Sequence, residues 1–227
     1  MKRKTLLSLL VIGLLSILNP GPVVAQSDKK PQLAKEGRTI EEIVPEGWEE
    51  QHEKGDLNKD GIEDLVLVVL SNDPANIRTR DDGYQYNFNP KVLTVYFGSP
   101  SGVYKQFKAW DKAIPGREDE YTDTEVHISI TPKGVMDIRV TFWSSAGTAD
   151  TGGTTYRYRF QSGDFYLIGE ESGWFNRMTG QGEMTSVNYL TGQKNVTTGN
   201  MIENKGMRTK KLKFKKEPLR LLGSFCM

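Results

Sequence analysis

The feature that most limits the fold of this chain is a series of short β-rich runs separated by turn residues. Seven runs of five to eight residues are rich in Val, Ile, Tyr and Phe: 65–70, 92–97, 103–107, 126–130, 135–142, 156–161 and 165–170. Weaker runs follow at 185–189 and 210–214. Turn residues at 98–102, 131–134 and 161–164 lie between consecutive runs, which favours antiparallel hairpins. We therefore expect a mainly β fold of antiparallel sheets, either sandwich-like or like part of a propeller.

One short N-terminal helix is expected before Pro45. Thr39 and Glu42 have the spacing of a capping box, in which each residue accepts a hydrogen bond at the start of a helix. At the other end of the chain, Leu212 and Phe214 alternate with lysines, so this strand has one apolar and one charged face. Lysines discourage another chain from pairing with a sheet edge, so we interpret it as a solvated edge strand rather than a surface that binds anions.

The first 25 residues have the pattern of a cleavable export signal. Lys2, Arg3 and Lys4 precede an apolar run at 6–18, and small residues precede Gln26. We expect a signal peptide at 1–25, a flexible tether at 26–38, and a single β-rich domain at 39–227. The expected location is the periplasm or the cell exterior, with no transmembrane segment after cleavage.

The charge and the cysteine content of the chain argue against one class of partner and exclude one source of stability. Cleavage would remove three of the 30 basic residues and none of the 29 acidic ones, leaving a net charge near −2. A nearly neutral chain with its bases scattered along the sequence argues against nucleic acid as a partner. Cys226 is the single cysteine, so an intramolecular disulfide is excluded.

The strongest local motif is an acidic loop at 56–64 that leads directly into the apolar run at 65–70. Its oxygen-bearing residues recur at every second position, and Gly61 permits the sharp turn that brings them together. The expected calcium ligands are the side chains of Asp56, Asn58, Asp60 and Asp64 and the carbonyl oxygen of Ile62. The loop is not an EF-hand, because Leu67 stands where a bidentate Glu would be required. We expect a structural Ca²⁺ that neutralises three crowded carboxylates and so stabilises the domain.

This loop resembles the calcium loop of FG-GAP-type repeats, as in integrin propellers. The four side-chain ligands match that Asp-x-Asn-x-Asp-Gly-x-x-Asp pattern, and Phe97 and Gly98 match the Phe-Gly that ends a later strand of those repeats. The resemblance covers roughly residues 55–107 and implies a calcium site. The run at 156–168 is similar to exported single-domain bacterial proteins that carry one such loop.

Catalytic motifs are weak by comparison. His52 and His127 are the two histidines, which is little material for a zinc cluster or a catalytic triad. Asp150 begins the Asp-Thr-Gly tripeptide of aspartic proteases, but that chemistry needs two carboxylates and one copy is present. We expect Asp150 to lie in a hairpin loop between strands that end at Phe142 and begin at Tyr156. The acidic residues at 118–125 are expected in a solvated loop.

An exposed aromatic pair completes the candidate sites. Trp174 and Phe175 lie between Gly173 and polar residues, which predicts a loop tip that could serve as a ligand platform. Together these features favour an exported, non-enzymatic, calcium-binding recognition module whose partner is a protein or glycan at the cell surface. Two alternatives stay open: a secreted hydrolase of cell-wall glycan or peptide that uses acids from 118–125 or Asp150, and a spacer in a surface assembly.

Overall fold

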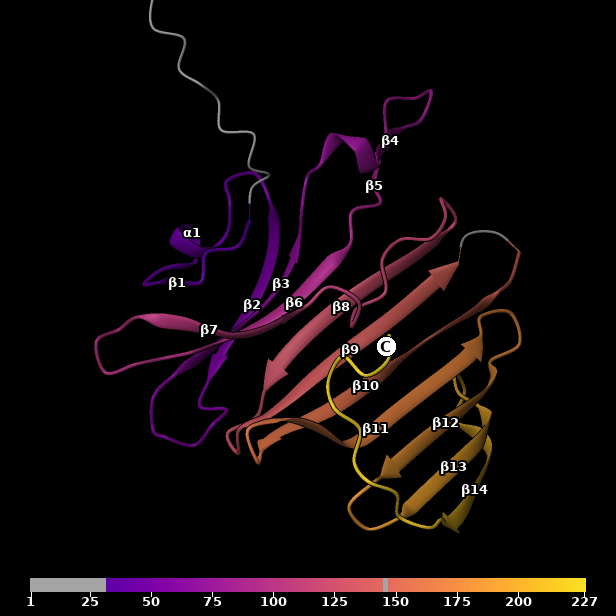
Figure 1. The fold of residues 1–227 in the computed structure, drawn as a ribbon. Helices are drawn as coiled ribbons and strands as arrows, with labels where there is room; N and C mark the ends of the chain where they lie inside the picture. Colours follow the sequence, from indigo (N-terminus) through magenta and orange to yellow (C-terminus); the bar gives the residue numbers. More distant parts are fainter. Residues whose placement is uncertain (1–31, 145–146) are drawn as a thin grey trace, which may run out of the picture. The chain divides into compact units, whose positions relative to one another are not determined.

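The computed structural model describes residues 32–144 and 147–227 (Figure 1). The expected signal peptide and residues 26–31 of the expected tether lie outside this part of the chain. The described chain is mainly β, as the sequence predicts, and its strands pair antiparallel. The elements in order are β1 (Glu36–Gly37), α1 (Ile40–Ile43), β2 (Glu49–Gly55), β3 (Asp64–Leu70), the 3-10 turn η1 (Pro74–Asn76), β4 (Ile77–Thr79), β5 (Gln85–Asn87), β6 (Lys91–Phe97), β7 (Tyr104–Trp110), β8 (Thr122–Ile130), β9 (Val135–Ser144), β10 (Asp150–Gln161), β11 (Asp164–Asn176), β12 (Gln181–Asn188), β13 (Gln193–Asn200) and β14 (Lys205–Lys213).

The predicted N-terminal helix is confirmed as α1. The Thr39 side chain accepts a hydrogen bond from the backbone N–H of Glu42 at 3.3 Å. Glu42 in turn accepts one from the backbone N–H of Arg38 at 2.7 Å. The first contact satisfies an N–H group that the start of a helix leaves without a partner, and the second ties the residue before the N-cap to the helix.

The first sheet has five strands in the order β1-β7-β6-β3-β2. Its inner strand β3, between β6 and β2, is buried on both faces, because Val66 and Val68 enter one apolar cluster while Leu65, Leu67 and Val69 enter another. A strand covered on both sides needs apolar residues at every position, which explains its unbroken apolar run. One cover is α1, through Ile43.

The second sheet has seven strands in the order β14-β13-β12-β11-β10-β9-β8, so each strand pairs with its neighbour in sequence. Figure 1 shows β8 to β14 as this succession of hairpins. The larger core cluster joins both sheets, with Leu93 and Val95 from β6 and Ile138 and Tyr158 from β9 and β10. Phe165 at the start of β11 is fully buried in it.

The lysine-bearing strand is confirmed as an edge. β14 is the outermost strand of the seven-stranded sheet, and all nine of its residues are exposed. The short strands β1, β4 and β5 are not expected from the sequence, and neither are two longer ones, β2 and β13. Their residues are largely polar, and they are held by pairing with β3 and with β12 and β14. Apolar patterning therefore misses strands whose stability comes from backbone pairing rather than from buried side chains.

Two boundaries differ from those expected. Residues 32–38 of the expected tether are part of the fold, since Glu36 and Gly37 pair with Lys105 and Tyr104 of β7. The expected 142–156 loop is shorter, because β9 continues to Ser144 and β10 begins at Asp150. Asp150, expected in that loop, begins β10 and pairs with Asn176 of β11. The next five residues are Gly and Thr, which carry little apolar signal, and their backbone groups pair with β9 and β11.

Candidate metal centre

The acidic loop at 56–64 forms the turn between β2 and β3. Gly55 at the end of β2 pairs with Asp64 at the start of β3, so the loop is closed by the first pair of an antiparallel ladder. The Leu57 side chain is fully buried and belongs to the core between the two sheets. The loop is thus anchored both by its ends and by one apolar side chain.

Asp56 organises the interior of the loop. Its Oδ1 accepts hydrogen bonds from the backbone N–H groups of Lys59 at 2.7 Å and Asp60 at 3.1 Å, and its Oδ2 accepts one from Gly61 at 3.0 Å. Lys59 and Gly61 have positive φ angles of 66° and 85°. Glycine adopts this left-handed conformation without strain, and it lets the chain turn inward around the Asp56 carboxylate.

Asn58 and Asp60 repeat the arrangement one step further along the loop. Asn58 Oδ1 accepts from the N–H of Asp60 at 2.9 Å, and Asp60 Oδ1 accepts from the N–H of Ile62 at 2.8 Å. The Asn58 amide also donates to Asp60 Oδ2 at 3.0 Å. The three alternate side chains predicted as ligands are therefore folded back onto one short loop, each with oxygen lone pairs left over.

Asp64 has a different environment, because it is fully buried. Its Oδ2 accepts hydrogen bonds from the backbone N–H groups of Leu57 at 2.8 Å and Asn58 at 3.3 Å, and its Oδ1 accepts one from Gly98 at 3.0 Å. Burial raises the pKa of the Asp64 carboxyl, these three N–H groups oppose the rise, and the nearby Asp60 carboxylate adds to it. One carboxylate thus joins the loop to the turn after β6.

Gly98 makes this close approach possible. A Cβ placed on Gly98 would overlap the carbonyl oxygen of Glu63 and lie 2.9 Å from the Ile62 side chain. Phe97, the preceding residue, packs against Phe107 and Phe160 in the core. The two residues of the Phe-Gly pair therefore have separate roles. Phe97 anchors the turn in the apolar core, and Gly98 lets the backbone approach the acidic loop.

The donor set suits a hard cation, although the carboxylates do not yet converge on one point. No group of three or more His, Cys, Asp and Glu side chains has the geometry of a metal site among residues 32–144 and 147–227. Asp56, Asn58 and Asp60 offer carboxylate and amide oxygens of the kind that Ca²⁺ prefers, while Asp64 holds backbone N–H groups. A cation would take up the remaining lone pairs and counter the mutual repulsion of these acids.

The aromatic platform differs from its prediction. Trp174 and Phe175 lie within β11 rather than at a loop tip, and neighbouring residues of a strand point to opposite faces. Trp174 and Phe142 share a cross-strand row through Gly152, whereas Phe175 and Trp143 share the next row. Trp174 is 47% exposed, and the exposed aromatic side chain that shares its row and face is Phe142, at 37%, rather than Phe175.

Several acids and both histidines considered for catalysis make local contacts. Asp150 accepts a hydrogen bond from the Asn176 amide at 2.8 Å. Asp119 accepts from the backbone N–H groups of Thr122 and Tyr121, and those bonds lower the pKa of its carboxyl. His52 and His127 lie beside Glu50 and Glu125 at 2.9 and 3.5 Å. These are contacts that shape turns and exposed strand edges.

A cavity of about 550 Å³, not expected from the sequence, lies between the β2 edge, the β4–β5 hairpin and β8. Lys91 lines it, and its Nζ donates to the carbonyl oxygen of Thr124 at 2.8 Å. Burial, with Arg117 nearby, lowers the pKa of the Lys91 amine. The lining residues come from separate strands and share no motif, which is why pattern reading misses them.

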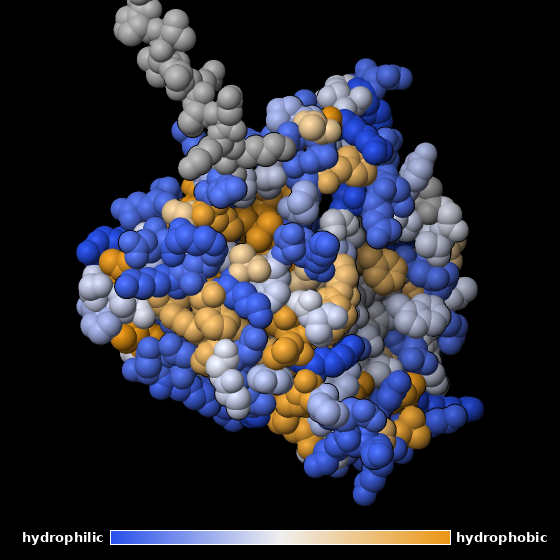
Figure 2. Space-filling view, in the orientation of Figure 1, coloured by the Kyte–Doolittle hydropathy of each residue, from blue (hydrophilic) through white to orange (hydrophobic). Residues whose placement is uncertain are grey.

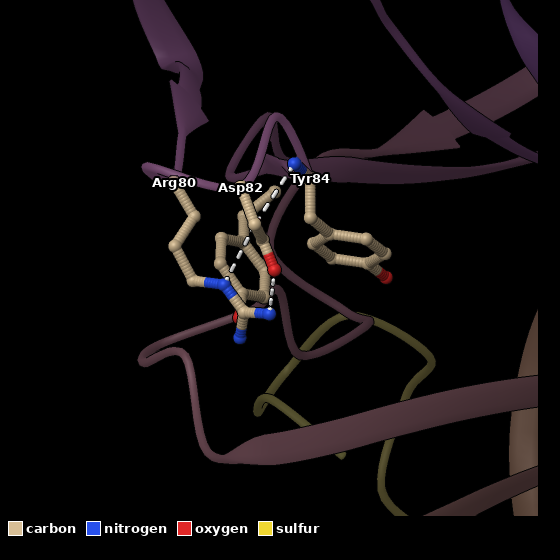
Figure 3. Close-up of polar contacts among 4 residues, drawn as sticks. Arg80, Asp82 and Tyr84 are labelled. Atoms are coloured by element: carbon tan, nitrogen blue, oxygen red, sulfur yellow. Dashed lines mark hydrogen bonds and ion pairs between the residues drawn. The ribbon is translucent and has the colours of Figure 1, made fainter.

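The tip of the β4–β5 hairpin beside this cavity is held by a charged pair (Figure 3). Arg80 donates from its Nε to Asp82 at 2.9 Å and makes a second, shorter contact through Nη2. The Asp82 carboxylate also accepts from the N–H of Tyr84 at 3.2 Å. The Arg80 hydrogen bond, helped by this N–H, lowers the pKa of Asp82 to about 2.

Comparison of the chain with protein-family models, with curated proteins and with solved structures finds no match. No helix among the described residues is long and apolar enough to cross a bilayer.

Proposed function

We propose that this protein is an exported, non-enzymatic recognition module of the cell envelope or surface, stabilised by a structural Ca²⁺ in the 56–64 loop. The observation that carries the calcium part is the inward folding of Asp56, Asn58 and Asp60 around positive-φ positions. Carboxylate and amide oxygens at alternating positions of a tight loop are the ligand arrangement that Ca²⁺ favours. Mg²⁺ fits less well, because it requires stricter octahedral geometry.

The recognition part rests on Trp174. A large aromatic side chain that is about half exposed on a sheet face offers apolar contact area to a partner. Its neighbours in the cross-strand row are Gly152 and Glu183, so the indole borders a residue without a side chain. This arrangement suits stacking on the flat face of a sugar ring or packing against an apolar side chain. The sheet, rather than a mobile loop, would hold the indole in place.

Calcium removal should lower the melting temperature of the mature protein. With a dissociation constant near 10⁻⁴ M and Ca²⁺ at 100 times that value, linkage contributes about 2.7 kcal/mol. For a domain of this size that corresponds to about 5–10 °C between Ca²⁺ and EGTA. Differential scanning calorimetry of the wild type and Asp60→Ala checks this, since the variant should lose the difference. Asp81→Ala, which removes an acid outside the loop, should keep it, and identical wild-type melts in Ca²⁺ and EGTA would remove calcium from the proposal.

Trp174→Ala should weaken binding to the recognised surface molecule by about 30-fold, as expected for an aromatic anchor at the centre of an interface. The assay is a binding screen of the Ca²⁺-loaded domain against arrayed envelope glycans and surface proteins, repeated with the variant. Trp143→Ala is the matched control, because Trp143 lies on the other face and stacks under Arg177 at 4.5 Å. Equal losses from both variants, or none from either, would contradict recognition at the Trp174 face.

A further inference from the structure

Positive charge is concentrated on one edge of the seven-stranded sheet. Residues 205–216 contain seven Lys and Arg residues and no Asp or Glu. The rest of the described chain contains 18 Lys and Arg against 28 Asp and Glu, so it carries a net charge near −10. The bases are therefore less evenly scattered than the sequence analysis holds: residues 205–216 carry about +7, while the rest of the described chain carries about −10.

These cations form two parallel rows along an extended strand. In the ladder with β13, Lys211 and Lys213 lie on one face of the sheet, and Arg208 and Lys210 on the other. Side chains on one face of a strand repeat about every 7 Å along its length. Lys215 and Lys216 prolong the exposed stretch beyond β14. Figure 2 shows hydrophilic side chains projecting from the region where Figure 1 places β13 and β14.

Little of this charge is neutralised within the protein. Lys205 pairs with Glu203 at 3.1 Å, and no other cation of 205–216 has an ion pair among the described residues. Lysines protect a sheet edge from pairing with another chain. Seven cations on one edge, six of them without an ion pair among the described residues, create an attractive field for a multivalent anion.

We infer that the β14 edge, residues 205–216, binds an anionic glycan, a linear polysaccharide bearing sulfate, phosphate or carboxylate groups. This inference rests on the proposed function and names the partner class for that module. Cations on both faces of one extended edge match a polymer lying along it, whereas a flat lipid surface would engage one face. Six of the seven cations are Lys, whose compact charge attracts anions without the planar, two-pronged recognition that Arg supplies.

The test measures binding of the mature protein to heparin, a sulfated glycan, at low and rising salt. The variant Lys210→Glu/Lys211→Glu/Lys213→Glu lowers the charge of residues 205–216 from about +7 to about +1. Its affinity for heparin should fall about 100-fold, and the slope of log affinity against log salt should become shallower by about three. The control variant Lys105→Glu/Lys112→Glu/Lys133→Glu changes the net charge by the same amount at other exposed lysines. Its affinity for heparin should fall less than about threefold.

Competing arms decide the partner class. Uncharged dextran should not bind, and anionic lipid vesicles and single-stranded DNA should bind more weakly than heparin. Tighter binding to vesicles or DNA, or equal losses in the two triple variants, would overturn the inference. Calorimetry of the same samples in Ca²⁺ and EGTA separates the two proposals. Heparin binding can be absent while the melting temperature still depends on Ca²⁺, and heparin can bind while the melting temperature does not depend on Ca²⁺. Unchanged melting of both variants shows that they fold.

Discussion

Replacing Asp64 with alanine should lower the free energy of unfolding by about 3–5 kcal/mol, in EGTA as well as in Ca²⁺. The carboxylate is fully buried and accepts hydrogen bonds from the N–H groups of Leu57, Asn58 and Gly98. Alanine would leave all three donors without an acceptor, and each buried donor without a partner costs about 1–3 kcal/mol. Relief from burying a carboxylate offsets part of that sum.

Urea unfolding followed by circular dichroism measures this loss, provided that the slope against denaturant stays the same as in the wild type. Asp64→Asn is the informative companion, because it keeps one acceptor oxygen and should lose about half as much. Asp60→Ala removes an exposed acid of the same loop and should cost less than about 1 kcal/mol in EGTA. A loss below about 1 kcal/mol for Asp64→Ala would mean that this carboxylate does not join the loop to the turn after β6.

Replacing Phe165 with alanine should cost a similar amount, about 3–5 kcal/mol, for a different reason. Its ring is fully buried and lies 5.1 Å from the Phe160 ring, 6.0 Å from Phe107 and 6.3 Å from Trp110, measured between centroids. These neighbours come from both sheets, so alanine would leave a cavity at the place where the sheets pack. Surrounding side chains refill such a space only in part.

Chemical denaturation again gives the measurement. Phe214→Ala is the control, since that ring is 37% exposed and should cost about 1 kcal/mol or less. Phe165→Leu should lose less than the alanine variant, because it restores much of the volume. If Phe165→Ala were no more harmful than Phe214→Ala, Phe165 would not be a contact on which the packing of the two sheets depends.

The residue types in the 56–64 loop predict its local folding. Contacts between residues far apart in the sequence cannot be predicted in this way. Asp56, Asn58 and Asp60 occupy alternate positions of one tight turn, and their folding back follows from local geometry. The contact between Asp64 and Gly98 spans 34 residues, and nothing local to either residue specifies it. Adjacency in the sequence predicts that Trp174 and Phe175 form one platform, but they lie in a strand, which directs neighbouring side chains to opposite faces.

The order of residues by itself determined that the fold is mainly β, where most strands and turns lie, that a short helix begins after Thr39, and that β14 is an edge. Each of these follows from side-chain preferences acting over a few residues. The tertiary structure alone decided the two sheet orders and the inclusion of the polar strands β2 and β13. Those features depend on which distant segments pair, and pairing is selected by the burial and hydrogen bonding of the whole chain rather than by any one stretch of it.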